Sequence, residues 1–282
     1  TSTSAVCVTG LATVDIGTTF TTIGQVILAF LIQIGGLGVT TIGAGIIILT
    51  GKKMDLKSVS IIKESSNLSS GKGVSKFVGT IFRTTLIIEL VGMLLSFIVF
   101  IQDMDFLTAL WVSIFHSVAS FNNSGFDILG GITRLDGSTF NQFGSLIFYK
   151  DNVLLNLTTS GLVILGGIGF LVIREVMKNK FKWKKYSMHT KVVITLSTVL
   201  IVVGTIFIKF TEDVSWLGAL FFSVSARTAG FATYDLAGFT RAGILVITIL
   251  MYIGASPGST GGGIKTTTFF AILQGIKSSA TN

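Results

Sequence analysis

Long stretches of the chain carry almost no charge, and this constrains the fold more than any other feature. Four apolar runs approach or exceed the roughly 20 residues that a helix needs to cross a bilayer. They are residues 23–49, 84–101, 153–173 and 192–208. Only 12% of the 282 residues are charged, about half the share in a usual soluble domain. The runs predict an all-α, multi-pass integral membrane protein of the cell (plasma) membrane.

The basic residues gather between the apolar runs. Of 21 lysines and arginines, seven lie between Lys52 and Arg83 and seven between Arg174 and Lys191. Loops rich in lysine and arginine stay on the cytoplasmic side of a membrane. We therefore predict that both segments are cytoplasmic, and that the formal charge of +8 reflects topology and not nucleic-acid binding.

Two further apolar runs, residues 108–120 and 215–226, are too short to cross the bilayer. They have 13 and 12 residues, at about 1.5 Å per residue. Each follows a crossing run and an acidic turn, and each precedes a polar segment that contains a glycine. We predict half-helices that enter from the outside, with an extended segment leading back out. An interfacial helix that lies flat is the alternative.

Three glycines mark a repeated pattern. Gly10, Gly125 and Gly230 are 115 and 105 residues apart and lie in VTGL, NSGF and TAGF, each followed by a glycine-containing crossing run. The spacing predicts three copies of helix, half-helix, glycine segment and helix, the first without its leading helix. The predicted boundaries are repeat 1 at 1–50, a cytoplasmic loop at 51–78, repeat 2 at 79–178, a cytoplasmic loop at 179–188, and repeat 3 with a broken inner helix at 189–282.

Glycine segments of this kind suit a cation pathway. Irregular backbone at membrane depth is tolerated only where protein buries it or where it lines a water-filled cavity. Glycine adopts backbone angles closed to other residues, so successive carbonyls can point the same way. Rings of such carbonyls replace the hydration shell of a permeating cation, and the negative C-terminal ends of the half-helices favour a cation as well. No charged side chain is needed.

The last crossing run is interrupted. MYIGASPGSTGGGIKTTT contains the only proline of the chain and five glycines, which make a continuous helix costly. We predict a helix broken by a mobile intramembrane gate loop; a static kink is the alternative. Lys265, at the edge of the loop, is either an electrostatic plug or a helix cap that reaches toward the cytoplasm. The other loop residues are Gly254, Ala255, Ser256, Pro257, Gly258, Ser259, Thr260, Gly261, Gly262 and Gly263.

Three charged residues flank the glycine segments. Arg227 is expected to brace the third segment by hydrogen bonds, because an unpaired charge there is costly; an ion pair with a carboxylate such as Asp235 is the alternative. Asp15 and Asp235 occupy equivalent positions at the predicted outer mouth. They either concentrate cations there or cap the next helix.

Other polar residues give weaker indications. Glu89, within a crossing run, is a functional candidate or has a partner inside the bundle. His116 is expected to be a hydrogen-bonding residue, since His189 is too far along the chain to share a metal with it and no metal-ligand spacing is present. No nucleophile–base pair or phosphate-binding loop is found, so the sequence predicts that the protein is not an enzyme.

CVTGLATVD, FNNSGFDIL, ARTAGFATYD and GASPGSTGGGIKTTT resemble the Trk/Ktr/HKT superfamily of potassium transporters over the whole chain. They most resemble the membrane subunits of bacterial Ktr systems. The resemblance implies one polypeptide of four non-identical repeats that conducts K⁺ and is often activated by Na⁺. The filter carbonyls that it implies belong to Val8, Thr9, Gly10 and Leu11, to Asn123, Ser124, Gly125 and Phe126, and to Thr228, Ala229, Gly230 and Phe231.

The resemblance also implies a homodimer in the lipid membrane, regulated by a cytosolic nucleotide-binding ring of the KtrA type. No fourth glycine segment precedes Asn282, so we expect a fragment that lacks the start of repeat 1 and all of repeat 4. The predicted function is the pore-forming subunit of a potassium uptake system. The alternatives are a Na⁺-coupled secondary K⁺ carrier with a midplane site, which usually has inverted repeats, and a non-conducting scaffold.

Overall fold

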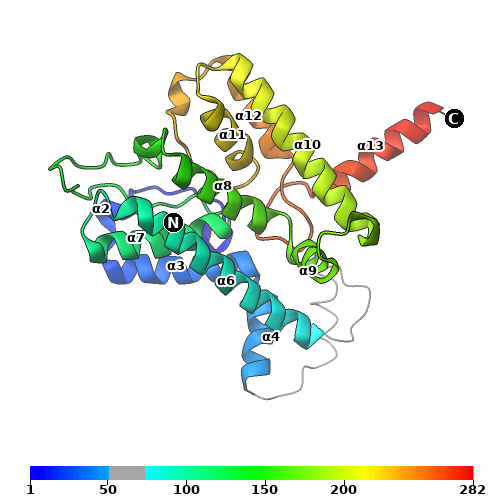
Figure 1. Ribbon diagram of the computed structural model, residues 1–282, viewed down its shortest axis with the longest axis horizontal. Helices are drawn as coiled ribbons and strands as arrows, with labels where there is room; N and C mark the ends of the chain where they lie inside the picture. Colours follow the sequence, from blue (N-terminus) through cyan, green and yellow to red (C-terminus); the bar gives the residue numbers. More distant parts are fainter. Residues whose placement is uncertain (51–73, 282) are drawn as a thin grey trace.

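The computed structural model describes residues 1–50 and 74–281 (Figure 1). Within these ranges every regular element is helical, apart from isolated bridges, in agreement with the predicted all-α class. The elements are α1 Ser2–Val6, α2 Ile16–Thr19, α3 Thr22–Leu37, α4 Val39–Leu49, α6 Val74–Phe100, α7 Phe106–Phe121, η1 Ile147–Tyr149, α8 Val153–Gly167, α9 Phe170–Asn179, η2 Trp183–Lys185, α10 Met188–Thr211, α11 Trp216–Ser225, η3 Leu236–Gly238, α12 Arg241–Tyr252 and α13 Thr266–Thr281.

Two helices, α6 and α10, are long and apolar enough to cross a bilayer. Their surfaces are the reverse of those of soluble helices. Leu86 and Phe210 are 59% and 81% exposed, whereas Ser96 and Ser197 are 0% and 5% exposed. Leucine and phenylalanine therefore face outward and serine faces the bundle, an arrangement that is stable when the outer surface contacts lipid.

The two short apolar runs form separate helices, α7 and α11, of 16 and 10 residues. Each begins at a polar cap: the Asp105 carboxylate accepts from Thr108 N at 3.1 Å, and the Ser215 hydroxyl accepts from Gly218 N at 3.0 Å. At about 1.5 Å per residue the helices extend about 24 and 15 Å, less than the hydrocarbon core of about 30 Å.

Two of the predicted crossing runs are not straight. The run 23–49 consists of α3 and α4, which meet at 98°, and the run 153–173 is divided between α8 and α9, which meet at 99°. Gly38 and Gly169 stand at the breaks with φ of 84° and 88°, a region that side chains rarely allow. The sequence did not indicate these breaks, because the run of apolar residues continues through both of them.

The predicted cytoplasmic loop 51–78 lies mainly outside the described residues, as do its lysines from 52 to 72. Its last part is helical, since α6 already begins at Val74. Phe77 and Val78 are buried, and Phe77 packs in a small core with Ile81 and Phe121. Lys76, one of the basic residues of the predicted loop, lies within the first turns of this helix.

The helices form two groups with α8 between them (Figure 1). On one side α3, α6 and α7 pack together, and on the other α10 packs against α11 and α12. Helix α8 contacts both half-helices, α7 and α11. The largest core cluster lies along these contacts and includes Phe100, Phe115, Phe126, Phe221 and Phe231. Helix α13 contacts α10 and then extends away from the bundle, with the C-terminus at its far end.

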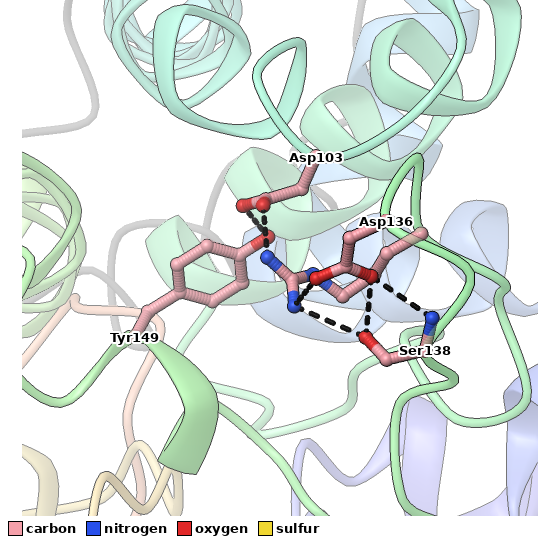
Figure 2. A network of polar contacts seen from close by, with 5 residues as sticks. Asp103, Asp136, Ser138 and Tyr149 are labelled. Atoms are coloured by element: carbon pink, nitrogen blue, oxygen red, sulfur yellow. Dashed lines mark hydrogen bonds and ion pairs between the residues drawn. The ribbon is translucent and has the colours of Figure 1, made fainter.

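A network of polar contacts links the end of α6 to the loop between α7 and α8 (Figure 2). Asp103, just after α6, binds the Arg134 guanidinium and accepts a hydrogen bond from the Tyr149 hydroxyl at 3.0 Å. Arg134 also pairs with Asp136 at 2.6 Å, and the Asp136 carboxylate accepts from the Ser138 backbone N at 2.9 Å. The network joins the end of α6 to the long loop between α7 and α8.

Candidate functional site

The three glycine segments lie side by side, although they are far apart in the sequence. A Cβ atom placed on Gly10 would come within 2.5 Å of the Ser124 carbonyl oxygen and 3.7 Å of Gly125 Cα. A Cβ on Gly125 would lie 2.3 Å from the Ala229 carbonyl oxygen and 3.2 Å from Gly230 Cα. The second segment therefore contacts both others through backbone atoms, with no space for side chains between them.

All three segments have the same unusual backbone. The glycines have φ of 78°, 69° and 86°, in chain order, and the residue two positions earlier is left-handed as well. Those earlier residues are Val8, Asn123 and Thr228, with φ of 52°, 56° and 129°. Non-glycine residues seldom adopt positive φ, and such strain persists only where the surrounding structure imposes it. Its recurrence at three matching places indicates a shared structural requirement.

Each segment begins where a short helix ends. Helices α1, α7 and α11 end at Val6, Phe121 and Ser225, four or five residues before the glycines. Thr9 N and Ser124 N each donate back to a helix carbonyl five residues earlier, at 2.9 Å. The C-terminal ends of three helices, which carry partial negative charge, are thus directed to one place.

The side chains along the segments differ in exposure. Ser124, Phe126 and Phe231 are buried, whereas Leu11 is 74% exposed. The Asn123 amide and the Thr228 hydroxyl are hydrogen bonded at 3.0 Å, which joins the second segment to the third. Phe126 and Phe231 pack in the main core, so their side chains anchor the segments from behind.

The last helix is interrupted between Tyr252 and Thr266, the predicted gate loop. The two ends of the loop come together: Gly254 N donates to Ile264 O at 3.1 Å and Ala255 N donates to Gly262 O at 3.0 Å. A Cβ on Gly254 would lie 2.1 Å from the Gly262 carbonyl oxygen, so the two strands of the loop are in backbone contact. The loop is a compact, folded segment whose two ends meet in a parallel bridge between Ile253 and Ile264.

This loop contacts the end of α7 and the second and third segments, and it is also hydrogen bonded to the break between α8 and α9. The Thr260 hydroxyl donates to the Phe121 carbonyl, at the end of α7, at 3.0 Å. A Cβ on Gly261 would lie 2.6 Å from the Thr228 hydroxyl and 3.1 Å from the Asn123 amide nitrogen. The loop therefore lies directly against the second and third segments. Three backbone hydrogen bonds join it to the break: Ser256 N to Gly167 O at 3.0 Å, Thr260 N to Gly166 O at 3.2 Å, and Phe170 N to Gly258 O at 2.9 Å.

Arg227 connects the third segment to its surroundings. Its guanidinium donates to the Ser197 carbonyl and hydroxyl at 3.5 and 3.4 Å and to the Gly254 carbonyl at 3.4 Å. No ion pair with Asp235 occurs among the described residues. The bonds reach α10 and the start of the loop, so Arg227 bridges these two elements.

Lys265 points back into the loop. Its ammonium group donates to the Gly261 carbonyl at 2.7 Å. The bond lies within the loop and closes its last residues on themselves.

The two outer aspartates differ in environment. Asp15 is 7% exposed, and its carboxylate accepts from Thr18 N at 2.9 Å and from Phe143 N at 2.8 Å. Asp235 is exposed and accepts from Ala237 N at 2.9 Å. Both begin a helical turn, and these contacts favour the capping role.

Two polar residues inside the bundle that the sequence singled out, His116 and Glu89, are hydrogen bonded. His116 contacts the Thr159 hydroxyl at 2.9 Å, and in the part of the chain that the structure describes no cluster of metal-ligating residues exists around either histidine. Glu89 accepts from the Asn122 amide at 3.3 Å, and that amide also donates to Gln33 at 2.8 Å. Asn122 joins α3, α6 and α7 just before the second segment; the sequence analysis missed it, although the Asn-Asn pair of FNNSGF is a visible signal.

Comparison with known proteins agrees with this geometry. A family model described as a cation transport protein, TrkH, matches residues 1–282. The chain is 38% identical to Ktr system potassium uptake protein B of Bacillus subtilis over 98% of its length and 62% of that protein. It is 35% identical to the potassium/sodium uptake protein NtpJ of Enterococcus hirae, over 97% of this chain and 60% of that one.

Structural comparison supports the same fold. The crystal structure of the potassium transporter TrkH from Vibrio parahaemolyticus aligns with 98% of this chain and 54% of its own, at a TM-score of 0.67 and 20% identity. The chain spans about 60% of the length of the two relatives from Bacillus subtilis and Enterococcus hirae. The resemblance of the glycine motifs to the superfamily is confirmed, and the chain belongs to the TrkH family of cation transport proteins.

Proposed function

We propose that the chain forms most of the pore of a potassium uptake subunit, which lets K⁺ pass down its electrochemical gradient. The observation that carries the proposal is the contact of three backbone segments that share the same left-handed pattern two residues apart. The names of the relatives from Bacillus subtilis and Enterococcus hirae, which include potassium uptake, support this choice of ion.

In this proposal the backbone carbonyls of the three segments select the ion. Positive φ at alternate residues, 8 and 10, 123 and 125, 228 and 230, allows successive carbonyls to face one side. Carbonyl oxygens replace the water that K⁺ loses on entry. The three helix ends add negative potential at the same place without a fixed charge that would hold the ion too tightly.

The loop of residues 254–265 is proposed as the gate. It lies against Asn123 and Thr228, the left-handed residues that begin the second and third segments. Its hydrogen bonds to the α8/α9 break hold it there. Movement of the loop away from this contact opens the path from the filter to the cytoplasm.

The partners proposed here rest on the resemblance to the family. We propose a homodimer in the plasma membrane, controlled by a cytosolic nucleotide-binding ring and activated by Na⁺. The word system in the names of the Ktr relatives supports a second component. The name of the Enterococcus hirae relative includes sodium, which supports Na⁺ as the second ion that acts on the protein.

The proposal is tested with the full-length protein in vesicles that hold K⁺ inside and a non-permeant cation outside. A passive pore lets K⁺ leave and generates an inside-negative potential without stoichiometric Na⁺ entry, even where Na⁺ is needed as an activator. A coupled carrier instead requires Na⁺ in fixed ratio to K⁺. Absence of K⁺ flux without Na⁺, with stoichiometric Na⁺ entry when it is added, would refute the pore and establish the carrier.

A further inference from the structure

A large lateral cavity lies outside the proposed ion path, where the first helix group meets the second. Its volume is about 620 Å³, within the roughly 300–1,000 Å³ of sites that hold drug-sized ligands. Its walls come from α6, the α8/α9 break, the turn after α9, and α10. Almost all of the lining side chains are apolar, for example Ile87, Leu165, Ile168, Ile194 and Ile201.

The turn after α9 forms the rim of this cavity in an unusual conformation. Lys180 and Phe181 are consecutive non-glycine residues with φ of 46° and 59°. Left-handed residues of this kind normally occur singly. The Asn179 amide donates to the Lys185 carbonyl at 3.2 Å and holds the turn closed. The strained turn directs Phe181 to the cavity rim while leaving it 83% exposed.

Charge and aromatic residues alternate along this rim. Phe181, Trp183 and Tyr186 line the cavity, whereas Lys182, Lys184 and Lys185 are exposed. The rim is predicted to lie at the cytoplasmic surface by the positive-inside rule, where aromatic residues also gather.

Among residues 1–50 and 74–281, no ion pair involves Lys182, Lys184 or Lys185. Glu175, on α9, accepts from Ser187 N at 2.7 Å and also binds the hydroxyls of Ser187 and Thr190. Within the described part of the chain, the rim therefore presents three lysines without a salt-bridge partner beside an apolar hollow.

We propose that this cavity binds one anionic membrane phospholipid, with an acyl chain between α6 and α10 and the phosphate at Lys182, Lys184 and Lys185. An apolar hollow that opens sideways in a membrane takes hydrocarbon in preference to water. Basic groups at the cytoplasmic side of a pocket between membrane helices select an anionic headgroup.

The site is connected to the ion path through shared residues. Ile164, Ile168 and Ser197 line the lipid cavity and also a second cavity, of about 20 Å³, whose wall includes Arg227 and Thr228. Ser197 accepts the hydrogen bonds of Arg227. A bound acyl chain therefore contacts the residue that positions Arg227 beside the third segment.

Trp183 provides a direct assay that needs no transport. The full-length protein is reconstituted in neutral lipid, and one of two brominated lipids is added in increasing fractions: brominated phosphatidylglycerol in one series and brominated phosphatidylcholine in the other. Brominated acyl chains quench tryptophan fluorescence on contact. The Trp183 component is obtained as the difference from a Trp183→Phe variant. Trp216, 60% exposed on the opposite side of the membrane, gives the corresponding signal for ordinary lipid contact through Trp216→Phe.

We expect Trp183 quenching by phosphatidylglycerol to saturate at a low lipid fraction, and quenching by phosphatidylcholine to require a much higher one. Exposed basic groups contribute about a fivefold preference each. The triple variant Lys182→Gln, Lys184→Gln and Lys185→Gln should remove the preference, whereas the outer-side control Lys150→Gln with Arg241→Gln should keep it.

A second variant tests the cavity itself. Ile194→Phe with Thr198→Phe places two rings on one face of α10 in the cavity wall, and it should weaken the saturable quenching severalfold without changing the Trp216 signal. Equal, non-saturating quenching by both lipids overturns the proposal. Absence of Trp183 quenching by either lipid also overturns the proposal, because the cavity is then filled by protein, either a second copy or another part of the chain.

Discussion

Replacement of Gly125 by alanine tests the proposed filter most directly. Gly125 is the middle of the three contacting glycines, and its φ is 69°. An added Cβ would lie 2.3 Å from the Ala229 carbonyl oxygen, whereas ordinary contacts begin at 3.4 Å. One of the two segments must therefore move by about 1 Å. The displaced atom is a carbonyl oxygen that we assign to the ion path.

The expected effect on selectivity is large. Alanine in the left-handed region costs roughly 1–2 kcal/mol, which lowers stability without a direct effect on the ion. Loss of one well-placed polar partner from a desolvated group costs about 1–3 kcal/mol. Because about 1.4 kcal/mol changes an equilibrium tenfold, the preference of the Gly125→Ala protein for K⁺ over Na⁺ should fall by about tenfold or more.

The assay compares the ion preference of matched variants in the full-length protein. Reversal potentials, or competing K⁺ and Na⁺ fluxes in vesicles, give the preference independently of how much protein is active. Gly230→Ala is the control inside the filter, because its φ is 86° but its Cβ would meet only Gly125 Cα, at 3.7 Å. Gly137→Ala is the control outside it, with φ of 84° and no atom within 4 Å.

The variants should therefore rank Gly125→Ala, then Gly230→Ala, then Gly137→Ala, with the last equal to the unchanged protein. A normal K⁺ preference in a folded, conducting Gly125→Ala protein would show that these carbonyls do not select the ion. An equal loss in all three variants would mean that backbone strain alone, and not displacement of the Ala229 carbonyl, changes the preference.

Three further outcomes are expected. Arg227→Gln removes the bridge to the Gly254 carbonyl, so K⁺ flux through the unregulated protein should rise severalfold in vesicles, with ion preference unchanged. Lys265→Met removes the bond that closes the loop and should likewise raise flux; unchanged flux in both variants would contradict the proposed gate. Burial, with the hydrogen bond to Asp103, raises the pKa of Tyr149 well above its ordinary value of 10.0, so this group contributes stability that is complete below about pH 10 and decreases as the pH rises further. Thermal unfolding between about pH 9 and 11 should show a smaller alkaline loss for Tyr149→Phe than for the unchanged protein.

The sequence predicted which segments are helices better than it predicted where the helices bend. The apolar runs predicted α6, α7, α10 and α11, because length and the absence of charge are visible in the sequence itself. The bends at Gly38 and Gly169 were missed. Each glycine lies in a run with several other glycines, and only the packing of the neighbouring elements determines which one turns the chain.

The site shows the same division. The spacing of Gly10, Gly125 and Gly230 predicted that three segments are related, and these residues are adjacent in the structure. The positive φ of Val8 and Asn123 had no signal, since valine and asparagine share no property that requires it. The partners of Arg227 and Lys265 depend on contacts between distant elements, which one sequence does not contain. The roles of the filter and gate residues stay predictions.

The number of bonds that hold the loop limits how the proposed gate can work. Three backbone hydrogen bonds to the α8/α9 break and the bond from Thr260 to the end of α7 are lost if the loop swings away. At about 1 kcal/mol each, their loss favours the closed state by about 4 kcal/mol, or a factor of roughly 1,000. Thermal motion alone therefore opens the path rarely. A regulator opens it only by binding the open form more tightly than the closed form by a similar factor. The break between α8 and α9 carries three of these bonds, and α9 connects the break to the basic turn that follows it. In the proposed mechanism, a cytoplasmic partner that moves α9 would therefore act on the gate through this break.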